Sequence, residues 1–345
     1  MEAINRVIAS RQFTMGSEVS EFEKEFANYL GSKFCVMVNS GSSANLLMLA
    51  ALSLIPKFQL PKDSEVIVPA VSWATTFYPV HQLGYKLRFV DIDPLTLNLN
   101  VDRVLDSINS STSAIFAVNL LGLPSPLDQL QEICEQNNLI LIEDNCESLG
   151  ASLQSKLTGT WGVMGSFSSY FSHHMSTMEG GMICTDDEEI YHYLVSIRSH
   201  GWTRGLPAKN FVKNKSDNPW DHLFDFALPG YNLRPIEFEA AVGREQLKKL
   251  PDFLEAREEN QKYFYSTFSQ IESLVLQVGP GKTSSFGFSM YLGNPEISEL
   301  NGQIIRTKIV SALHKIGVES RPIVTGNFTK NSVMKYLNHA PLAEY

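Results

Sequence analysis

A short polar segment near the middle of the chain carries two adjacent histidines. Residues 166–181 read Ser-Phe-Ser-Ser-Tyr-Phe-Ser-His-His-Met-Ser-Thr-Met-Glu-Gly-Gly, with His173 and His174 at the centre and no lysine. Apolar residues stand before and after the segment, which indicates a buried strand, a polar turn and a second strand. Imidazole can transfer protons near neutral pH, because its ordinary pKa is about 6.5. The segment is therefore the first candidate for a catalytic site.

Other roles for these histidines remain open. His173 by itself could be a core histidine whose hydrogen bonds are satisfied. Two adjacent histidines could also suggest a metal, but chain neighbours seldom converge on one ion, and the sequence contains no HxxxH or HExxH pattern. We therefore expect no bound metal.

A second candidate site is the small-residue turn Ser40-Gly41-Ser42, between an apolar strand-like run and a helical run. Such a turn presents free backbone N–H groups and hydroxyls to a phosphate at the start of the helix. Similar turns cap many helices without binding a ligand, so this turn alone is a weak signal.

Two acidic residues, Asp144 and Glu147, follow the apolar run 139–142. Ligands of parallel α/β sheets gather at the carboxyl ends of strands, so both carboxyl groups are candidates for a ligand site. An aspartate that only caps a turn at the strand end would explain Asp144 as well. Trp73, which opens a predicted helix, is a further candidate, although core packing is a strong competing explanation for a single tryptophan.

The elements that would position these groups alternate between strands and helices. This alternation predicts an α/β fold with a mainly parallel central sheet covered on both faces. Helices are predicted over 17–30, 187–198 and 304–316, and Leu250-Pro251 predicts a kink. We expect a large domain over 1–250 and a smaller α+β domain over 251–345, from which a C-terminal piece is possibly missing. The strand-like runs are 35–39, 65–69, 87–93, 114–119 and 139–144.

The composition excludes several classes of protein. The chain has 345 residues, 43% of them hydrophobic, and a formal charge of −9, which argues against general nucleic-acid binding. It has no apolar run long enough to span a membrane and no secretory pattern at its start. Its cysteines, at positions 35, 134, 146 and 184, lack CxxC spacing, so we expect four reduced thiols in a cytoplasmic enzyme.

Taken together, the order of these motifs resembles the DegT/DnrJ/EryC1/StrS family of sugar aminotransferases, which bind pyridoxal 5′-phosphate (PLP). In that family a Ser-x-x-x-x-Lys run is followed six residues later by an acidic residue and two glycines. Ser168 and Glu179-Gly180-Gly181 match this pattern, but His173 stands at the lysine position. Histidine cannot hold PLP covalently as the lysine does. The pattern is similar to that of the family's PLP-dependent sugar 3-dehydratase branch.

The resemblance covers essentially the whole chain and implies a role for each candidate residue. It implies a PLP-dependent fold of type I, like that of aspartate aminotransferase, with PLP or pyridoxamine phosphate (PMP) bound non-covalently. His173 is the implied catalytic residue. The implied cofactor contacts are Gly41 and Ser42 at the phosphate, Trp73 on the ring, Asp144 at the pyridine nitrogen, Glu147 beside the 3-hydroxyl, Ser168, and Asn232 at the phosphate of the neighbouring subunit.

The reaction implied by the resemblance is loss of the C3 hydroxyl from GDP-4-keto-6-deoxymannose. Glutamate would supply the amino group of PMP, and ammonia would be released with the 4-keto-3,6-dideoxy sugar. His200, Arg204 and Arg321 are candidate contacts to the sugar nucleotide or glutamate, although a polar helix end and solvated arginines explain them equally well. The position of Asn232 implies a homodimer with shared active sites.

Three alternatives remain for comparison. An ordinary nucleotide-sugar aminotransferase would need a lysine from elsewhere, and Lys156 is the nearest in sequence. A protein of the same fold that only binds a sugar nucleotide and regulates would release no ammonia. An iron–sulfur-dependent sugar dehydratase needs closely spaced cysteine ligands, whereas the nearest pair here, Cys134 and Cys146, is 12 residues apart. We reject this last alternative.

Overall fold

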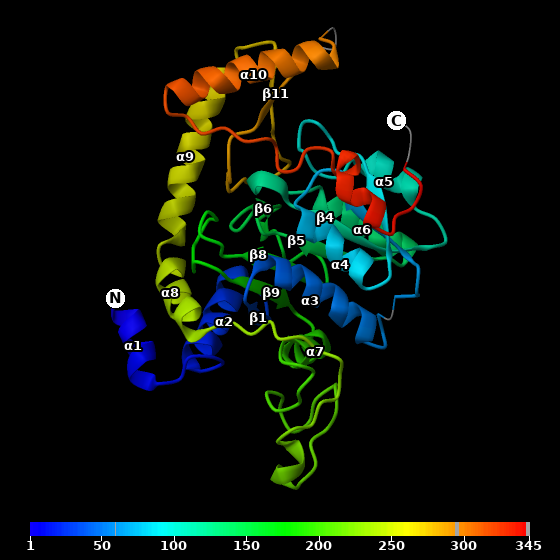
Figure 1. Ribbon diagram of the computed structural model, residues 1–345, viewed down its shortest axis with the longest axis vertical. Helices are drawn as coiled ribbons and strands as arrows, with labels where there is room; N and C mark the ends of the chain where they lie inside the picture. Colours follow the sequence, from blue (N-terminus) through cyan, green and yellow to red (C-terminus); the bar gives the residue numbers. More distant parts are fainter. Residues whose placement is uncertain (59, 294–296, 343–345) are drawn as a thin grey trace.

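A seven-stranded sheet forms the centre of the computed structural model, which describes residues 1–58, 60–293 and 297–342 (Figure 1). Its strand order is β1-β9-β8-β5-β4-β2-β3. Strand β9 runs antiparallel to both of its neighbours, and the other neighbouring pairs are parallel. The predicted α/β fold with a mainly parallel sheet is therefore confirmed. The strands are β1 (Phe34–Val38), β2 (Glu65–Pro69), β3 (Lys86–Val90), β4 (Thr112–Val118), β5 (Ile140–Asp144), β8 (Met164–Ser168) and β9 (Gly181–Thr185).

The remaining elements surround this sheet. The helices are α1 (Glu2–Ser10), α2 (Ser17–Leu30), α3 (Gly41–Leu54), α4 (Ala74–Gln82), α5 (Val101–Ser107), α6 (Leu127–Asn137), α7 (Glu188–Arg198), α8 (Glu237–Leu247), α9 (Leu250–Phe268) and α10 (Glu299–Lys315). Two small antiparallel pairs are β6 (Ser152–Leu153) with β7 (Lys156–Leu157) and β10 (Leu274–Leu276) with β11 (Met290–Leu292). Short 3-10 helices are η1 (Leu120–Gly122), η2 (Pro219–His222), η3 (Phe328–Lys330) and η4 (Ser332–Tyr336).

Helices cover the sheet on both faces because successive strand residues point in opposite directions. In β2, Val66 and Val68 join a core that includes α3, α4 and α7, whereas Ile67 joins a core that includes α5 and α6. Helix α3 has apolar residues on most of its surface and is largely buried. It lies across the sheet, so the turn that opens it is held rigidly at one edge.

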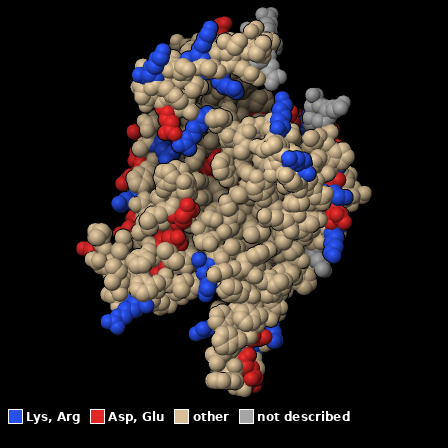
Figure 2. Space-filling view, in the orientation of Figure 1, with Lys and Arg blue, Asp and Glu red and all other residues tan. Residues whose placement is uncertain are grey.

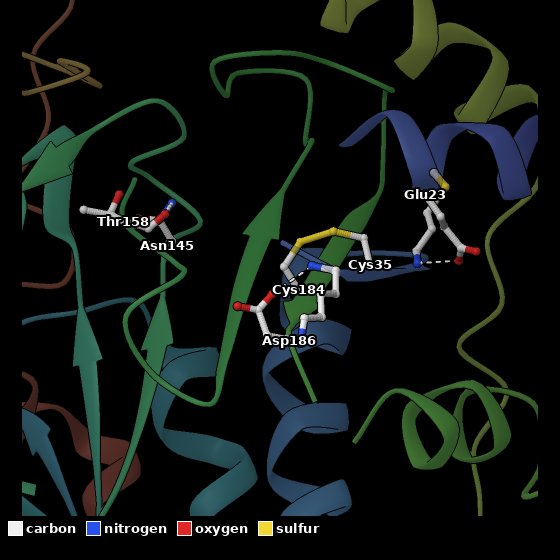
Figure 3. Close-up of a disulfide and its surroundings, with 8 residues drawn as sticks. Glu23, Cys35, Asn145, Thr158, Cys184 and Asp186 are labelled. Carbon is white, nitrogen blue, oxygen red and sulfur yellow. Dashed lines mark hydrogen bonds between the residues drawn. A yellow bond between two sulfur atoms is a disulfide. The ribbon is translucent and has the colours of Figure 1, made fainter. Parts of the chain in front are cut away.

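The edge strand β1 is fixed by side chains and by a disulfide (Figure 3). Met37 N donates to the Glu23 carboxylate at 2.8 Å, which satisfies an outward-facing amide of the edge strand. Cys35 on β1 and Cys184 on β9 lie directly opposite each other and form a disulfide. The expectation of four reduced cysteines was therefore wrong. Pairing across the sheet brings together two cysteines that are 149 residues apart in the chain.

The chain after α8 leaves the large sheet and later returns to it (Figure 1). The predicted break at Leu250-Pro251 is confirmed, since α8 ends at Leu247 and α9 begins at Leu250. After α10, Phe328 is buried beside Phe77, with ring centroids 4.4 Å apart. The division into domains at residue 250 stays a prediction, and the segment after α10 contributes to the core of the large sheet.

An arm formed by residues 200–228 projects from the body at the opposite end from α10 (Figure 1). Trp202 stacks on Phe224 and Phe226 within this arm, with ring centroids 5.9 and 5.8 Å away.

Figure 2 shows that charged side chains are sparse in the middle of the face over α3 and α4, and neither helix contains Asp, Glu, Lys or Arg. Within the described ranges, no helix has the length and apolarity needed to cross a membrane.

Candidate active site

The candidate residues meet where the strands β1, β5 and β8 end and β9 begins. A Cβ atom on Gly41 would lie 2.7 Å from Ser168 Cβ and 2.9 Å from Cys146 Sγ. A Cβ atom on Gly181 would lie 2.3 Å from the carbonyl oxygen of Ser40. These approaches exclude any larger residue without a shift of the backbone, so the two glycines allow the turns after β1 and β8 to pack together.

The amino end of α3 has the geometry of an anion site. Ser40 caps the helix, and its hydroxyl accepts from Ser43 N at 3.1 Å. The first intrahelical bond runs from Ala44 N to Ser40 O, so the N–H groups of Gly41 and Ser42 precede it. The exposed Ser42 hydroxyl shares a hydrogen bond with Thr75 at 2.8 Å. A phosphate fits these donors and the positive end of the helix dipole.

Asp144 lies buried at the carboxyl end of β5 in one defined orientation. Its Oδ2 accepts from Asn45 Nδ2 and Thr76 Oγ1, both at 2.8 Å, and its Oδ1 accepts from Cys146 N at 3.1 Å. The preceding residue, Glu143, points to the other face and accepts from backbone amides, including Gly159 N at 2.7 Å. Of the two acids, Asp144 is therefore the one available to a cationic ring nitrogen.

Glu147 lies half-buried on the turn after Asp144. Its Oε2 accepts from Leu121 N at 3.1 Å. Burial, and to a smaller extent the charge of Asp144, raise the pKa of Glu147 from 4.5 to about 7, while the hydrogen bond from Leu121 N acts to lower it. A carboxyl group with this pKa can hold or release a proton near neutral pH, which suits a group placed beside a phenolic hydroxyl.

The turn from Ser168 to Gly181 presents His173 where the charge of Asp144 acts on it. His173 N donates to Tyr170 O at 2.9 Å, which closes the turn. Burial lowers the pKa of His173 from 6.5 to about 4, while Asp144 acts to raise it and Arg257 to lower it. The imidazole is therefore neutral at pH 7 and able to accept a proton. Its Nδ1 is buried without a hydrogen-bond partner among the described residues.

Trp73 and Ser168 complete the candidate site. Trp73 stands at the start of α4 with 59% of its surface exposed, which excludes core packing as the explanation for this tryptophan. Ser168 ends β8, and its hydroxyl accepts from Tyr170 N at 3.3 Å. Stacking of Trp73 on a cofactor ring stays a prediction.

Four predicted residues are not joined to His173 by any contact within the described chain. Asn232 is exposed and accepts from Arg234 Nε at 3.0 Å, although its neighbour Leu233 accepts from Asn39 N beside the end of β1. His200 and Arg204 lie on the arm, where Arg204 sits over the Trp202 ring. Arg321 is exposed and paired with Glu319 at 2.6 Å. Their roles remain predictions.

The structure also reveals contributors that the sequence did not indicate. Asn45 and Thr76 orient Asp144, and Phe286 lies against His173, with ring centroids 5.0 Å apart. Asn45 lies one turn into α3, close in sequence to the Ser40-Gly41-Ser42 turn, so its position was a usable signal. Phe286 comes from a distant segment without a recognisable motif, and nothing local marked it.

PLP fits the arrangement of these residues. The helix end offers a phosphate site, Asp144 offers a carboxylate for the ring nitrogen, and His173 has an unpartnered buried nitrogen. Lys156, the nearest lysine considered for covalent attachment, instead places its ammonium over the Trp161 ring, 4.7 Å from the centroid. Within the described part of the chain, no group of His, Cys, Asp or Glu is arranged to hold a metal.

Comparison with known proteins gives a consistent result. The sequence model of the DegT/DnrJ/EryC1/StrS aminotransferase family matches residues 1–342. A relative from Escherichia coli O55:H7, GDP-4-keto-6-deoxy-D-mannose 3-dehydratase, is 50% identical over 98% of this chain and 86% of its own length. A solved structure of the E. coli dehydratase with bound hydrated PLP has a TM-score of 0.94 at 50% identity, covering 98% of this chain and 86% of that one.

A second solved structure is GDP-4-keto-6-deoxymannose-3-dehydratase with a trapped PLP–glutamate geminal diamine. It has a TM-score of 0.94 at 49% identity and covers 98% of this chain and 87% of that one. Both solved structures contain a B6 cofactor, and one of them also contains glutamate.

Proposed function

This chain belongs to the DegT/DnrJ/EryC1/StrS aminotransferase family, and we propose that it is a PLP-dependent dehydratase that removes the C3 hydroxyl of GDP-4-keto-6-deoxy-D-mannose. The single observation that carries the proposal is His173, which stands where the aminotransferases have their lysine and is buried where the charge of Asp144 acts on it. The 50% identity to a dehydratase of this specificity supports the substrate.

The chain's own residues hold the cofactor without a covalent bond. Gly41 N, Ser42 N and the Ser42 hydroxyl bind its phosphate, and Asp144 accepts from its ring nitrogen. When bound, PLP stabilises negative charge that develops on the attached substrate carbon, which is the chemistry that a dehydration beside a ketone requires. The Asn45 and Thr76 hydrogen bonds hold the Asp144 carboxyl group in the orientation that would face that ring nitrogen.

His173 is the proposed proton carrier. Its buried imidazole is neutral at pH 7, so it can accept a proton from a carbon next to the reacting nitrogen and deliver that proton to a different atom. Glu147, with a pKa of about 7, shares a proton with the hydroxyl of the ring. Because residue 173 is a histidine and not a lysine, it cannot recapture the cofactor covalently. The cofactor would therefore stay free in the site long enough for the sugar to lose its C3 hydroxyl.

The same comparison supports the proposed substrates. Glutamate is the proposed amino donor, as the PLP–glutamate complex of the related dehydratase suggests. We assign the binding of the sugar nucleotide and of the glutamate carboxylates to His200, Arg204 and Arg321, because these residues are exposed. We also infer a cytoplasmic location, where nucleotide sugars and glutamate are available.

The assembly is proposed to be a homodimer in which Asn232 binds the cofactor phosphate of the neighbouring subunit. Asn232 is exposed beside the end of β1, which leaves its amide available to a second chain. Exposed aromatic residues on the arm, including Trp220 and Phe224, and the sparsely charged face in Figure 2 offer apolar surface for the contact.

A reaction assay tests the proposal. Purified protein, PLP and glutamate are incubated with GDP-4-keto-6-deoxymannose and, separately, with its CDP-linked gluco counterpart. Only with the GDP substrate do we expect ammonia, about one molecule per turnover, and a lighter sugar. The sugar should be about 16 mass units lighter because it has lost one oxygen atom. An amino sugar without ammonia would identify an aminotransferase, and the absence of any product would support a regulator. His173→Asn serves as the inactive control.

A further inference from the structure

Residues 283–286, here called the strap, lie between β10 and β11 in the chain and contact the catalytic turn. The Ser284 carbonyl contacts His174 Nε2 at 3.1 Å. On the other side of the strap, Ser284 N donates to Gly122 O and Phe286 N donates to Leu121 O, both at 3.0 Å. The strap is therefore bonded along its length to two loops of the active-site edge.

Arg257 of α9 holds the last two residues of the strap. Its Nη1 donates to Ser285 O at 2.8 Å and to Phe286 O at 3.4 Å. Among the described residues, no carboxylate forms an ion pair with this half-buried guanidinium. Hydrogen bonds from a charged donor to carbonyl groups are stronger than neutral ones, so Arg257 is a firm anchor for the strap.

The loop beneath the strap requires glycine. Gly122 has φ +86, and a Cβ atom there would lie 2.5 Å from Ser285 N. In the same loop, Leu121 N donates to Glu147 Oε2. The strap and the proton-sharing Glu147 are therefore attached to a single short loop, which fixes the strap relative to the cofactor edge.

This anchoring places the Phe286 ring against the catalytic imidazole. The Phe286 and His173 centroids are 5.0 Å apart with an interplanar angle of 63°. Tyr170 contacts the same imidazole at 5.9 Å and 83°. Edge-on aromatic contacts of this kind have defined geometry, so they favour one orientation of the imidazole. Two aromatic rings thus contact the imidazole, whereas its Nδ1 atom has no hydrogen-bond partner among the described residues.

We propose that Phe286 is a positioning residue for His173: anchored by Arg257 and by the Leu121–Gly122 loop, its ring fixes the orientation of the imidazole and shields it from water. The role rests on the proposed function in so far as His173 is the proton carrier. The charged groups that act on the pKa of His173 are Asp144 from β5 and Arg257 from α9, and His173 in turn lowers the pKa of the adjacent His174.

The test uses the apo protein as well as the enzyme with PLP. Histidine labelled with ¹³C at Cε1 gives one NMR signal per imidazole, and the signal that disappears in His173→Asn identifies residue 173. In the wild type this signal should titrate near pH 4. In Phe286→Ala it should titrate closer to the ordinary 6.5, because water enters beside the ring. Arg257→Gln should shift it in the same direction.

Kinetics provide the second measurement. In Phe286→Ala, kcat for dehydration should fall by about 10- to 100-fold while the KM for the sugar nucleotide changes little, since orientation rather than binding is lost. Phe286→Leu keeps an apolar side chain and should restore part of the rate. It also provides a variant that folds if the alanine variant does not. The matched control is Phe288→Ala, because Phe288 lies two residues along and stacks on Phe264 at 4.7 Å instead.

An unchanged His173 titration in both Phe286 variants, or an equal shift in Phe288→Ala, would overturn the positioning role. The titration is measured without cofactor or substrate, so it reports on Phe286 even if the wild-type protein fails to dehydrate the sugar. In that event the proposed function fails and the contact between Phe286 and His173 is still tested.

Discussion

The amide of Asn45 donates to the Oδ2 atom of Asp144 at 2.8 Å, although 99 residues separate the two in the chain. Thr76 donates to the same oxygen, and the Asn45 carbonyl oxygen accepts from Ser166 Oγ at 2.6 Å. The side chain of Asn45 is therefore oriented by the sheet and in turn orients the carboxylate. Helix α3 thus contributes to the candidate site twice: its amino end offers donors to the proposed phosphate, and one turn later Asn45 orients Asp144, the proposed partner of the ring nitrogen.

Asn45→Asp should weaken PLP binding. Two carboxyl groups in this buried position would share a proton, so Asp144 would no longer be a fully ionised acceptor. We expect an affinity loss of about tenfold or more, which corresponds to about 1.4 kcal/mol, measured by PLP absorbance titration. Asn109→Asp is the matched control, since Asn109 donates to Glu65 at 2.9 Å at the other edge of the sheet. Equal effects in both variants would contradict the explanation.

His173→Lys should capture PLP covalently and abolish dehydration. An amine at this position can bond to the cofactor, whereas the imidazole cannot. After borohydride reduction, mass spectrometry should find the cofactor mass on the peptide that contains residue 173 in this variant only. Neither the wild type nor His173→Asn should carry the label on any lysine, including Lys156. Dehydration at the wild-type rate by His173→Lys would disprove the assigned role.

Glu147→Gln should stabilise the apo protein more at pH 8 than at pH 4.5. The pKa of Glu147 is raised in the folded state to about 7 from 4.5. Below pH 4.5 both states hold the proton and the group contributes nothing. As the pH rises to 7, only the unfolded state releases it readily, so the wild type loses stability across that window. Glutamine removes this penalty, which we expect to be on the order of 2 kcal/mol.

Urea unfolding at several pH values measures the difference. Glu258→Gln provides a control of opposite sign, because hydrogen bonds from Lys262 and Lys282 lower the pKa of Glu258. That variant should lose stability relative to the wild type as the pH rises toward 4.5, and the difference should stay constant above this value, where Glu258 is ionised in both states. A Glu147→Gln difference that does not change with pH would show that the pKa of Glu147 is the same in the folded and unfolded states.

Much of the site could be predicted from the sequence because its parts lie at the ends of elements with strong local patterns. The turn before α3, the acid at the end of β5 and the polar turn after β8 are each marked by residues close in sequence. Parallel strands then bring their carboxyl ends to one edge, so these groups had to meet. The contacts that orient them are different in kind, as the pair Phe286 and His173 shows.

Long-range contacts of this kind depend on pairing that local patterns do not encode. The apolar residues of β9 indicate a strand but not that it runs antiparallel between β1 and β8. For this reason the opposition of Cys35 and Cys184 could not be foreseen from their spacing. The anchoring of Phe286 by Arg257 likewise depends on how α9 lies against the strap, which follows from tertiary packing alone.

Gly181→Ala should disturb the phosphate turn. The added Cβ atom would meet Ser40 O at 2.3 Å and Gly41 N at 2.7 Å, which are backbone atoms that cannot rotate away. We expect a loss of about 1–3 kcal/mol in unfolding free energy and weaker PLP binding. Gly302→Ala is the control, because its nearest neighbour is 3.7 Å away and alanine favours a helix by about 1 kcal/mol. Normal PLP affinity in Gly181→Ala would refute the close packing.

The Cys35–Cys184 disulfide predicts the number of free thiols in the purified protein. Under denaturing, non-reducing conditions a thiol reagent should modify only Cys134 and Cys146, and reduction should raise the count from two to four. Replacing both Cys35 and Cys184 with alanine should lower the unfolding free energy by about 2–4 kcal/mol, since the bond closes a long loop in the unfolded chain. Cys134→Ala controls for the loss of a buried thiol without a crosslink. Four reactive thiols before reduction would show that the two strands are held by hydrogen bonds and packing alone.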